Sequence, residues 1–516
     1  MKTRTVRTIM NNRTDSPPSA PAYRDTLFSR TGRVINRSCA LVFNILGNTE
    51  KLVADILRDS LAVAGEAEAV YARAWDRAAS VNAAIRSAPR FTRLFSDLVR
   101  IVASYRIHSV KSRFLSDAEA AQTLEALHQK NARRIYDLCV EMRGGLIKIG
   151  QFASTYTNAL PPAYIEYLGR LQDRVPPVPY KAIARRIESE FGRPAEQVFA
   201  RVDPEPIAAA SLAQVHRAEL HDGTRVVIKV QMPDIENTAE IDLTAFTIAA
   251  DLTNDLFPAL GLSEISRALA DSVKKELDYR QELDNILRFN RQTVDDPRVV
   301  APKVYPGLST QRILTMEKLE GEHLIPFLEA AAPDRRNRLL ALIAESFCSQ
   351  IVTHGFFHAD PHPGNMFVLP GDRLGLIDFG CVEHFSAETY ALYMEMISAI
   401  LSRDAEAMAR LFESMGFSAG AGAGAPLREM ATDFIELLML DPDQSLADVD
   451  TTEKLTRGLE LIKKYPGIRV PRHFVLLGRV LLTLGGVMMR YNPDINIFML
   501  MVDQVGKSAG QNVCTG

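Results

Sequence analysis

One stretch constrains this chain more than any other: residues 358–380, which read HADPHPGNMFVLPGDRLGLIDFG. It contains the pattern H-x-D-x-x-x-x-N followed by D-F-G, which is typical of a phosphoryl-transfer catalytic loop and its metal-binding segment. In such a site Asp360 faces the hydroxyl to be phosphorylated, while Asn365 and Asp378 hold Mg²⁺ against the nucleotide phosphates. Because this chemistry depends on positioned charge, the rest of the chain should supply a lysine, its glutamate and a phosphate loop.

A candidate lysine lies 131 residues before Asp360, on the predicted strand Arg225–Val230. The turn that precedes this strand contains Asp222-Gly223, and Asp-Gly between two strand-like runs predicts a β-hairpin. The sequence Val-Val-Ile-Lys, which ends at Lys229, is similar to the V-A-I-K strand whose lysine reaches nucleotide phosphates. Lysines on edge strands are common, so it is the combination with the catalytic-loop pattern that favours Lys229 as a nucleotide ligand.

The glutamate that orients this lysine should come from the helix predicted within residues 263–290. Glu276 and Glu282 are six residues apart, which is about 240° around a continuous helix, so both cannot face Lys229. We assign Glu282 to Lys229, an opposite charge that keeps the lysine charged and oriented. This leaves Glu276 and Asp278 for another task. The alternative for the individual acids is a solvated helix face.

The loop before the hairpin has alanines where a phosphate loop would have glycines. Alanine restricts φ and favours a helical turn, so a nucleotide would be held differently, with polar contacts from the side chains that follow. The alternative is that the alanines are small core residues. The predicted nucleotide contacts are Ala208, Ala209, Ala210, Ser211 and Gln214.

Two further observations concern the region around the catalytic loop. The strand predicted at Gln311–Met316 leads into a hinge, where backbone groups of Glu317 and Leu319 would contact the adenine edge. After Gly380 there is no A-P-E motif and no room for a long activation segment. The surface on which protein kinases dock a peptide is therefore predicted to be absent.

Lys148 and Gln151 lie three residues apart in an otherwise apolar helical run, and so share one helix face. The alternative is a lysine whose ammonium extends to solvent at a helix end. His354 and His358 have a metal-ligand spacing, but HGFFH lacks the glutamate of HExxH and no third ligand is evident, so zinc is disfavoured. His358 is expected to order the catalytic loop through hydrogen bonds.

Composition limits the partners, compartments and membrane attachments that this chain can have. The net charge of −3 argues against a nucleic-acid binder, and five scattered cysteines without a CxxC pair favour a reducing compartment. Residues 1–48 are basic and predict either an organelle transit peptide or a disordered tail, with the tail favoured. Phe474–Met489 is apolar but only 16 residues long and contains Arg479, so a buried helix is favoured over a membrane span. A helix that lies against a membrane is the alternative.

Taken together, these pieces make the chain resemble the UbiB/AarF-type (ABC1-like) family of atypical kinases, which is linked to ubiquinone biosynthesis. The resemblance covers roughly residues 100–490. Ala213 stands where many relatives have glycine, and the C-terminal membrane spans of some bacterial relatives are not expected here. The matching pieces are Lys148–Gln151 as K-x-G-Q, Ala208–Ser211 as the alanine-rich loop, Lys229, Glu276–Asp278 as E-x-D, the HADPHPGN loop and D-F-G.

The resemblance implies an α+β, protein-kinase-like two-lobed fold with an all-helical N-terminal extension and a mostly helical C-lobe. It implies that Lys148 and Gln151 meet Glu276 and Asp278 over the active site, and that ATP and Mg²⁺ bind there. The corresponding segments are 1–48 (basic N-terminus), 49–180 (helical extension), 181–316 (N-lobe) and 317–505 (C-lobe).

The resulting prediction is an atypical kinase or ATPase that binds Mg-ATP in an occluded site and supports ubiquinone or other isoprenoid-lipid metabolism. The implied partners are a nucleotide, isoprenoid or quinone-precursor lipids, lipid-biosynthesis enzymes and a membrane surface contacted peripherally. The alternatives are a kinase for a small molecule or protein, and a nucleotide-gated scaffold without turnover. The predicted location is the cytoplasm or the periphery of the inner membrane, with organelle import left open by the basic N-terminus.

Overall fold

The computed structural model describes residues 65–514 apart from 67, 84, 86–87, 155–159, 172–175, 257–261, 418–423 and most of 439–469. The basic segment at residues 1–48 lies outside the described residues. The chain divides into two compact units: Met1–Asn82 with Phe95–Leu127, and Ala83–Leu94 with His128–Gly516. The predicted helical extension, residues 49–180, is therefore shared between the two units.

The first unit is helical and packs through one apolar side of each helix. Helix α5 begins with a capping box, in which Ser116 N donates to Glu119 Oε2 at 3.0 Å and Glu119 N donates to Ser116 Oγ. The Trp75 ring meets the edge of Phe95 at 6.1 Å. The unit contains most of α4 (Pro89–Lys111) and the first part of α5 (Asp117–Met142), and its buried apolar residues include Val70, Ala74, Ala78, Leu98, Val99 and Val102.

The helices that open the second unit are joined by a buried ion pair. The Arg90 guanidinium donates to both carboxylate oxygens of Asp242, at 2.6 and 2.7 Å, and to the carbonyl oxygen of Met142 at 2.8 Å. Burial raises the pKa of Asp242 to about 6, and Arg90 opposes this rise. Arg90 thereby fastens the start of α4 (Pro89–Lys111) and the end of α5 to α10. The helices of this part are α6 (Gly145–Ser154), α7 (Pro162–Gly169), α10 (Ile235–Leu256) and α11 (Leu262–Glu276).

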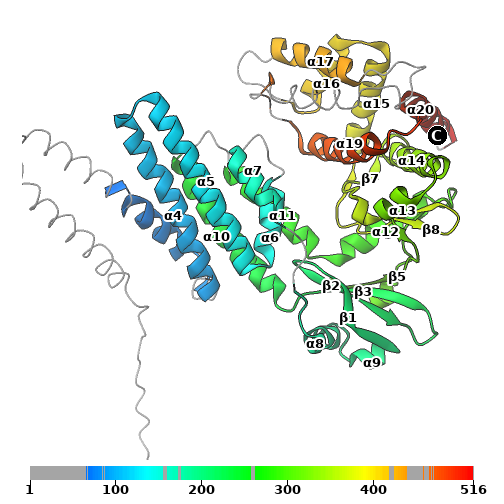
Figure 1. Cartoon of the computed structure of the whole chain (residues 1–516), viewed down its shortest axis with the longest axis horizontal. Helices are drawn as coiled ribbons and strands as arrows, with labels where there is room; N and C mark the ends of the chain where they lie inside the picture. The colour runs from blue at the N-terminus through cyan, green and yellow to red at the C-terminus, as the bar shows by residue number, and fades with distance from the viewer. Residues whose placement is uncertain are drawn as a thin grey trace, which may run out of the picture. The chain divides into compact units, whose positions relative to one another are not determined.

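A four-stranded antiparallel sheet, in the order β1-β2-β3-β5, forms the centre of the N-lobe. The predicted β2–β3 hairpin is confirmed: Gly223 takes a φ of 84°, and Thr224 N donates to Asp222 Oδ1 at 2.9 Å. Helices α8 and α9 cover one face of the sheet (Figure 1). Val226, Ile228 and Val230 point into that covered face, so Lys229 projects from the opposite one. The elements are α8 (Tyr180–Phe191), α9 (Ala195–Val198), β1 (Arg201–Ala209), β2 (Ala213–Glu219), β3 (Arg225–Gln231) and β5 (Ile313–Glu317).

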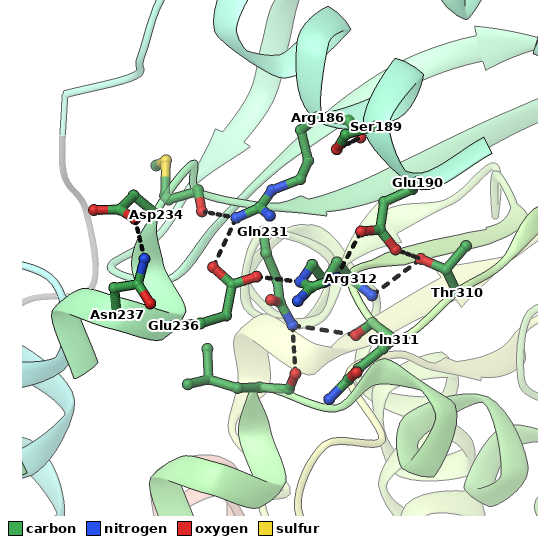
Figure 2. A network of polar contacts seen from close by, with 12 residues as sticks. Arg186, Ser189, Glu190, Gln231, Asp234, Glu236, Asn237, Thr310, Gln311 and Arg312 are labelled. Atoms are coloured by element: carbon green, nitrogen blue, oxygen red, sulfur yellow. Dashed lines mark hydrogen bonds and ion pairs between the residues drawn. The ribbon is translucent and has the colours of Figure 1, made fainter. Parts of the chain in front are cut away.

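An ion-pair network fastens α8 to the start of α10 and to the approach to β5 (Figure 2). Arg186 Nη2 lies 2.8 Å from Glu236 Oε2, and Arg312 Nη1 lies 2.8 Å from Glu190 Oε1. Arg312 also pairs with Glu236, and Thr310 Oγ1 donates to Glu190 Oε2 at 2.6 Å. Arg312 therefore bridges two acids that come from different helices.

We expect Arg312→Leu to lower the free energy of unfolding by about 1–2 kcal/mol, because both acids lose a charged hydrogen-bond donor. The effect is limited because the Arg312 side chain is 37% exposed and its ion pairs are partly screened by water. Urea denaturation followed by circular dichroism measures the change. A matched control is Arg335→Leu, which removes an exposed pair with Asp372 outside the network. Equal stability of the two variants would contradict a structural role for the network.

The C-lobe is mostly helical and has a continuous apolar core that includes Leu340, Ile343 and Phe357. Helix α14 (Pro333–Cys348) is followed directly by a π-helical segment, η4 (Ser349–Thr353). Ser386 caps helix α15 (Ala387–Ser402), since its Oγ accepts a hydrogen bond from Thr389 N at 3.1 Å. The mixed α+β fold, with helices ahead of the sheet and a helical C-lobe, agrees with the prediction.

The remaining elements follow in chain order. They are α12 (Tyr279–Gln292), β4 (Val299–Val300), β6 (Glu322–His323), α13 (Leu324–Ala330), α14 (Pro333–Cys348), η4 (Ser349–Thr353), β7 (Phe356–His358), η5 (Pro363–Asn365), β8 (Met366–Leu369), β9 (Arg373–Leu376), β10 (Val382–His384), α15 (Ala387–Ser402), α16 (Ala405–Ser414), α17 (Gly424–Leu438), α19 (Arg472–Tyr491) and α20 (Ile497–Cys514).

Helix α19 is apolar on two sides. Leu477, Val480 and Leu484 are buried in the C-lobe core, whereas Leu481 and Leu482 are about half exposed. Within the described part of the chain, His473–Tyr491 is the one helix long and apolar enough to cross a membrane, with a mean hydropathy of 1.4 and 28% of its window buried. The expectation of a buried core helix therefore holds for one face of α19 only.

Candidate active site

Lys229 stands between two acids on the uncovered face of the sheet. Its Nζ lies 2.8 Å from Glu282 Oε2 and 3.2 Å from Asp378 Oδ1. The ring of Tyr279 packs 5.2 Å from the ammonium. Burial by itself would lower the pKa of Lys229, but the charges of Asp378 and Glu282 outweigh it and hold that pKa well above its usual value. The structure thus brings together the lysine, the assigned glutamate and the D-F-G aspartate.

The helix that carries the acids is interrupted, and this overturns one step of the sequence argument. Asp278 has extended backbone angles and caps α12, where its side chain accepts a hydrogen bond from Arg280 N at 3.1 Å. Because the chain breaks between α11 and α12, the 240° separation of a continuous helix does not apply to Glu276 and Glu282. Burial raises the pKa of both carboxyl groups, and the charge of Lys229 opposes the rise in each.

His358 organises the catalytic loop, as predicted. Its Nδ1 accepts a hydrogen bond from Asp360 N at 3.2 Å, and its Nε2 lies 3.0 Å from the carbonyl oxygen of Ile377, to which it donates in this tautomer. Burial lowers the pKa of His358, so the ring is neutral and keeps these two roles. Gln350 adds a contact that the sequence analysis missed: its Oε1 accepts a hydrogen bond from His358 N at 3.0 Å, from within the π-helical segment.

The D-F-G segment is held in a strained but defined conformation. Asp378 has a φ of 61°, while its side chain stays 49% exposed. Phe379 is fully buried, with its ring 4.9 Å from Phe289 and 5.0 Å from His358. Its carbonyl oxygen accepts a hydrogen bond from Asn285 at 2.9 Å. The Lys229 ammonium lowers the pKa of Asp378 to about 2 against the effect of burial, so this carboxylate is ionised at neutral pH.

The other two catalytic-loop residues have different surroundings. Asn365 Nδ2 donates to the carbonyl oxygen of Asp360 at 3.1 Å. The Asp360 side chain accepts a hydrogen bond from Arg479 Nη2 at 2.7 Å. In the sequence, Arg479 stands out only as a charge in an apolar segment, and that unusual placement was the signal available.

The alanine-rich loop differs from its predicted conformation. Ala208 and Ala209 continue strand β1, and Ala210 N donates to Ala213 O at 2.8 Å to close a tight turn, so the expected helical turn is wrong. The physical reason is that pairing with β2 satisfies the backbone of the alanines. Ser211 Oγ is buried in this turn without a partner among the described residues.

Gln214 was predicted to contact the nucleotide, but its side chain is bonded within the protein. Its side chain is fully buried and bonds both the N–H and the carbonyl oxygen of Val178, the latter at 3.4 Å. It also lies 3.2 Å from His216 Nε2. Gln214 therefore fastens the linker before α8 to β2, a role that depends on a contact 36 residues away and that local sequence does not reveal.

At the hinge, Glu317 ends β5 and donates its N–H to the carbonyl oxygen of Lys303 at 2.7 Å. A contact of Glu317 with adenine would therefore use its carbonyl group. Leu319 lies further along, and its side chain comes close to Gly375 on β9. The adenine contacts of both residues remain predictions.

Helix α6 brings Lys148 to the same cluster of charges. Lys148 Nζ lies 2.8 Å from Glu276 Oε1, and its charge contributes to the low pKa of Asp378. Gln151 and Asp278 are not brought together as the resemblance implied. Gln151 Nε2 instead donates to the carbonyl oxygen of Leu171 at 3.2 Å, and Asp278 is the α12 cap. The expected contact of Lys148 with Glu276 is therefore present, whereas Gln151 and Asp278 have other partners.

Gly150 lets α6 pack closely enough for this contact. A Cβ added at Gly150 would lie 2.3 Å from Leu171 Cδ1 and 3.4 Å from Leu168 Cδ2.

We expect Gly150→Ala to cost about 1–3 kcal/mol of unfolding free energy, because the Leu171 side chain must move to make room for the added methyl group. Thermal unfolding measures this. Gly169→Ala is the control, since nothing lies within 4 Å of a Cβ there. Equal melting temperatures of the two variants would show that the packing around α6 accommodates a methyl group at residue 150.

The donors at this site fit Mg²⁺ and a nucleotide. The Asp378 carboxylate and the Asn365 amide oxygen are hard oxygen ligands, and Mg²⁺ in such sites takes its remaining ligands from phosphates and water. No group of three His, Cys, Asp or Glu side chains that could hold a metal ion occurs among the described residues. The unpartnered Ser211 hydroxyl offers a polar contact beneath the alanine turn. When bound, Mg²⁺ neutralises charge on the phosphates.

Comparison with known proteins agrees with this geometry. Residues 170–412 match the ABC1 atypical kinase-like domain. The chain is 33% identical over 362 residues to an uncharacterized protein of Synechocystis, covering 68% of this chain and 88% of that one. It is 31% identical over 379 residues to a chloroplastic aarF domain-containing protein kinase of Arabidopsis thaliana, covering 68% of this chain and 70% of the relative.

Other relatives are longer. The chain spans 53% of the length of the chloroplastic protein named Activity of BC1 complex kinase 3 of Arabidopsis thaliana, at 31% identity over 72% of this chain. Among solved structures, the Rv3197–erythromycin complex from Mycobacterium tuberculosis superposes with a TM-score of 0.51 and 24% identity, covering 75% of this chain and 97% of that chain. This likeness concerns the fold. With its lysine, two acids and catalytic loop assembled as described, the chain belongs to the ABC1/aarF family of atypical kinase-like proteins.

Proposed function

We propose that this protein binds Mg-ATP between Lys229 and the catalytic loop and cleaves its terminal phosphoanhydride bond. The observation that carries the proposal is the position of Lys229, which is held by Glu282 and lies 3.2 Å from the D-F-G aspartate. Lys229 would orient the α- and β-phosphates, and Asn365 and Asp378 would hold Mg²⁺. Asp360 would orient the attacking hydroxyl or water.

The surroundings of the site favour ATP hydrolysis over protein phosphorylation. Only six residues separate Gly380 from α15, and three of them form β10, which pairs with β7. This leaves no activation segment on which a peptide could dock. Lys148 adds a further charged side chain beside Asp378. Both features restrict access by a protein substrate.

We propose further that the activity serves isoprenoid or quinone-precursor lipids at a membrane surface. The support is the exposed apolar face of α19, where Leu481 and Leu482 are 51% and 49% exposed in the lobe that carries the catalytic loop. Apolar side chains of this kind can enter the boundary between headgroups and acyl chains. The location would then be peripheral to a membrane.

The test is phosphate release from ATP by the purified chain, alone and with anionic vesicles that carry a quinone-precursor mimic. We expect turnover without an added protein substrate and stimulation by the vesicles. Leu481→Ser/Leu482→Ser should lose the stimulation and keep the basal rate. Val294→Ser, at an apolar residue that is 73% exposed elsewhere, is the control. Transfer of radiolabelled phosphate from ATP to a small molecule or a protein would favour a kinase instead. ATP binding without hydrolysis would favour a scaffold.

A further inference from the structure

Asp360 is held by a cation that the catalytic loop itself does not contain. The residues between Asp360 and Asn365 are Pro, His, Pro and Gly, none of which carries a fixed positive charge. Among the described ion pairs, the one that involves Asp360 is with Arg479 of α19, at 2.7 Å. The arginine lies 119 residues further along the chain.

The other cations of the site are committed elsewhere. Lys229 is paired with Glu282 and Asp378, and Lys148 is paired with Glu276. The charges of both ammonium groups act on Asp378, the proposed metal ligand. Arg479 is instead the cation paired with Asp360, the carboxylate proposed to orient the attacking hydroxyl or water.

Arg479 is also the single charged residue in the apolar run from Phe474 to Met489. Its neighbour Val480 is fully buried, and its own side chain is 36% exposed. A charge in such a helix is costly unless it is paired. A partner on a surface loop would satisfy the charge equally well, yet the arginine reaches the candidate catalytic carboxylate.

We propose that Arg479 is a catalytic arginine that binds the γ-phosphoryl group during its transfer, a role that rests on the function proposed above. Its guanidinium has five N–H donors in a planar fork, and the described contact with Asp360 uses one of them. The remaining donors can bond equatorial oxygens of the transferring group, where charge is distributed in the transition state. Contact with Asp360 places the fork beside the attacking atom.

The step balances with the groups named. The oxygen of the attacking water forms a bond to the γ-phosphorus, while the bond from that phosphorus to the β–γ bridging oxygen breaks and its electron pair leaves with ADP. The proton of the water passes to the Asp360 carboxylate oxygen that Arg479 does not bond, and then to solvent. Arg479 changes neither charge nor protonation, and acts by binding phosphoryl oxygens.

Two measurements on Arg479→Gln test this role. The first is steady-state ATP hydrolysis, in which we expect kcat to fall about 10³-fold while KM for ATP changes little. The second is calorimetric titration with Mg-ADP, alone and with aluminium fluoride as a mimic of the transferring group. We expect unchanged affinity for ADP and about 10²-fold or greater loss of the extra affinity that the fluoride confers.

Further variants separate catalysis from structure. Arg479→Ala should regain part of its rate when guanidinium is added, whereas a merely structural lesion would not respond to a small cation. Arg490→Gln is the matched control: it removes an arginine from the same helix, whose pair with Glu329 measures 2.6 Å on the surface. It should match the wild type in both measurements.

The outcomes are distinct. If the wild type hydrolyses ATP and Arg479→Gln keeps its rate and its fluoride-dependent affinity, the role of Arg479 is overturned and the proposed function stands. A faster Arg479→Gln would also overturn it, since the arginine would then be a brake on Asp360. If the wild type fails to bind Mg-ATP, the proposed function fails, and the role of Arg479 with it.

Discussion

Asp378→Asn should reduce ATP hydrolysis by about 10³- to 10⁴-fold, which corresponds to a loss of about 4–5.5 kcal/mol of transition-state stabilisation. The carboxylate is ionised at neutral pH because Lys229 lowers its pKa to about 2, so the substitution removes a full charge from the metal side of the site. The fold should survive, because asparagine tolerates the left-handed φ of 61° found here. Phosphate release and calorimetric binding of Mg-ATP measure the change.

Asp372→Asn is the control for this prediction. Asp372 also has a left-handed φ, of 57°, and also pairs with a cation, Arg335, but it lies in the β8–β9 turn outside the site. Its rate should equal that of the wild type. If Asp378→Asn hydrolyses ATP as fast as this control, the proposed function is wrong.

Lys229→Met should abolish binding of Mg-ATP and also lower the free energy of unfolding by about 3–5 kcal/mol. The second effect arises because Glu282 is only 3% exposed and would be left as a buried charge without its partner. Calorimetry with Mg-ATP and urea denaturation measure the two effects separately. A single variant cannot show whether binding is lost through chemistry or through instability.

The double variant Lys229→Met/Glu282→Gln resolves this. It removes the unpaired carboxylate, so most of the lost stability should return while nucleotide binding stays absent. Recovery of both properties would mean that Lys229 serves only to neutralise Glu282. If neither stability nor nucleotide binding recovers, the main contribution of Lys229 lies in its contact with Asp378.

The Lys229→Met variant should also show a defined pH dependence. Burial raises the pKa of Glu282, with Lys229 opposing the rise, so loss of the lysine raises that pKa further. A carboxyl group whose pKa is higher in the folded state than in the unfolded state binds its proton on folding. The variant should therefore gain stability relative to wild type as the pH falls from 8 to 5. A deficit that does not change with pH would show that Glu282 is not the source of the instability.

Most of the residues that meet in the candidate site were predictable from short patterns. Asp360, Asn365 and Asp378 are fixed by spacing within one loop and its neighbouring strand, and Lys229 by the alternation of a strand in a hairpin. Glu282 was assigned correctly, although the helix geometry used for it was wrong: the Asp278 cap interrupts the helix and brings Glu276 near as well. Local patterns succeed where one element sets the direction of a side chain.

By itself, the sequence determined the family and which residues were predicted for the site, because these depend on residue identity at short spacing. The tertiary structure alone decided three partnerships: Arg479 with Asp360, Gln214 with Val178, and Gln151 with Leu171. Each joins segments 20 to 119 residues apart, and a polar side chain takes whichever partner the packing brings within hydrogen-bond reach, since leaving it unpaired and buried is costly. Sequence spacing does not indicate which distant residue becomes the partner, so the pairing of Arg479 with Asp360 could be found only from the tertiary structure.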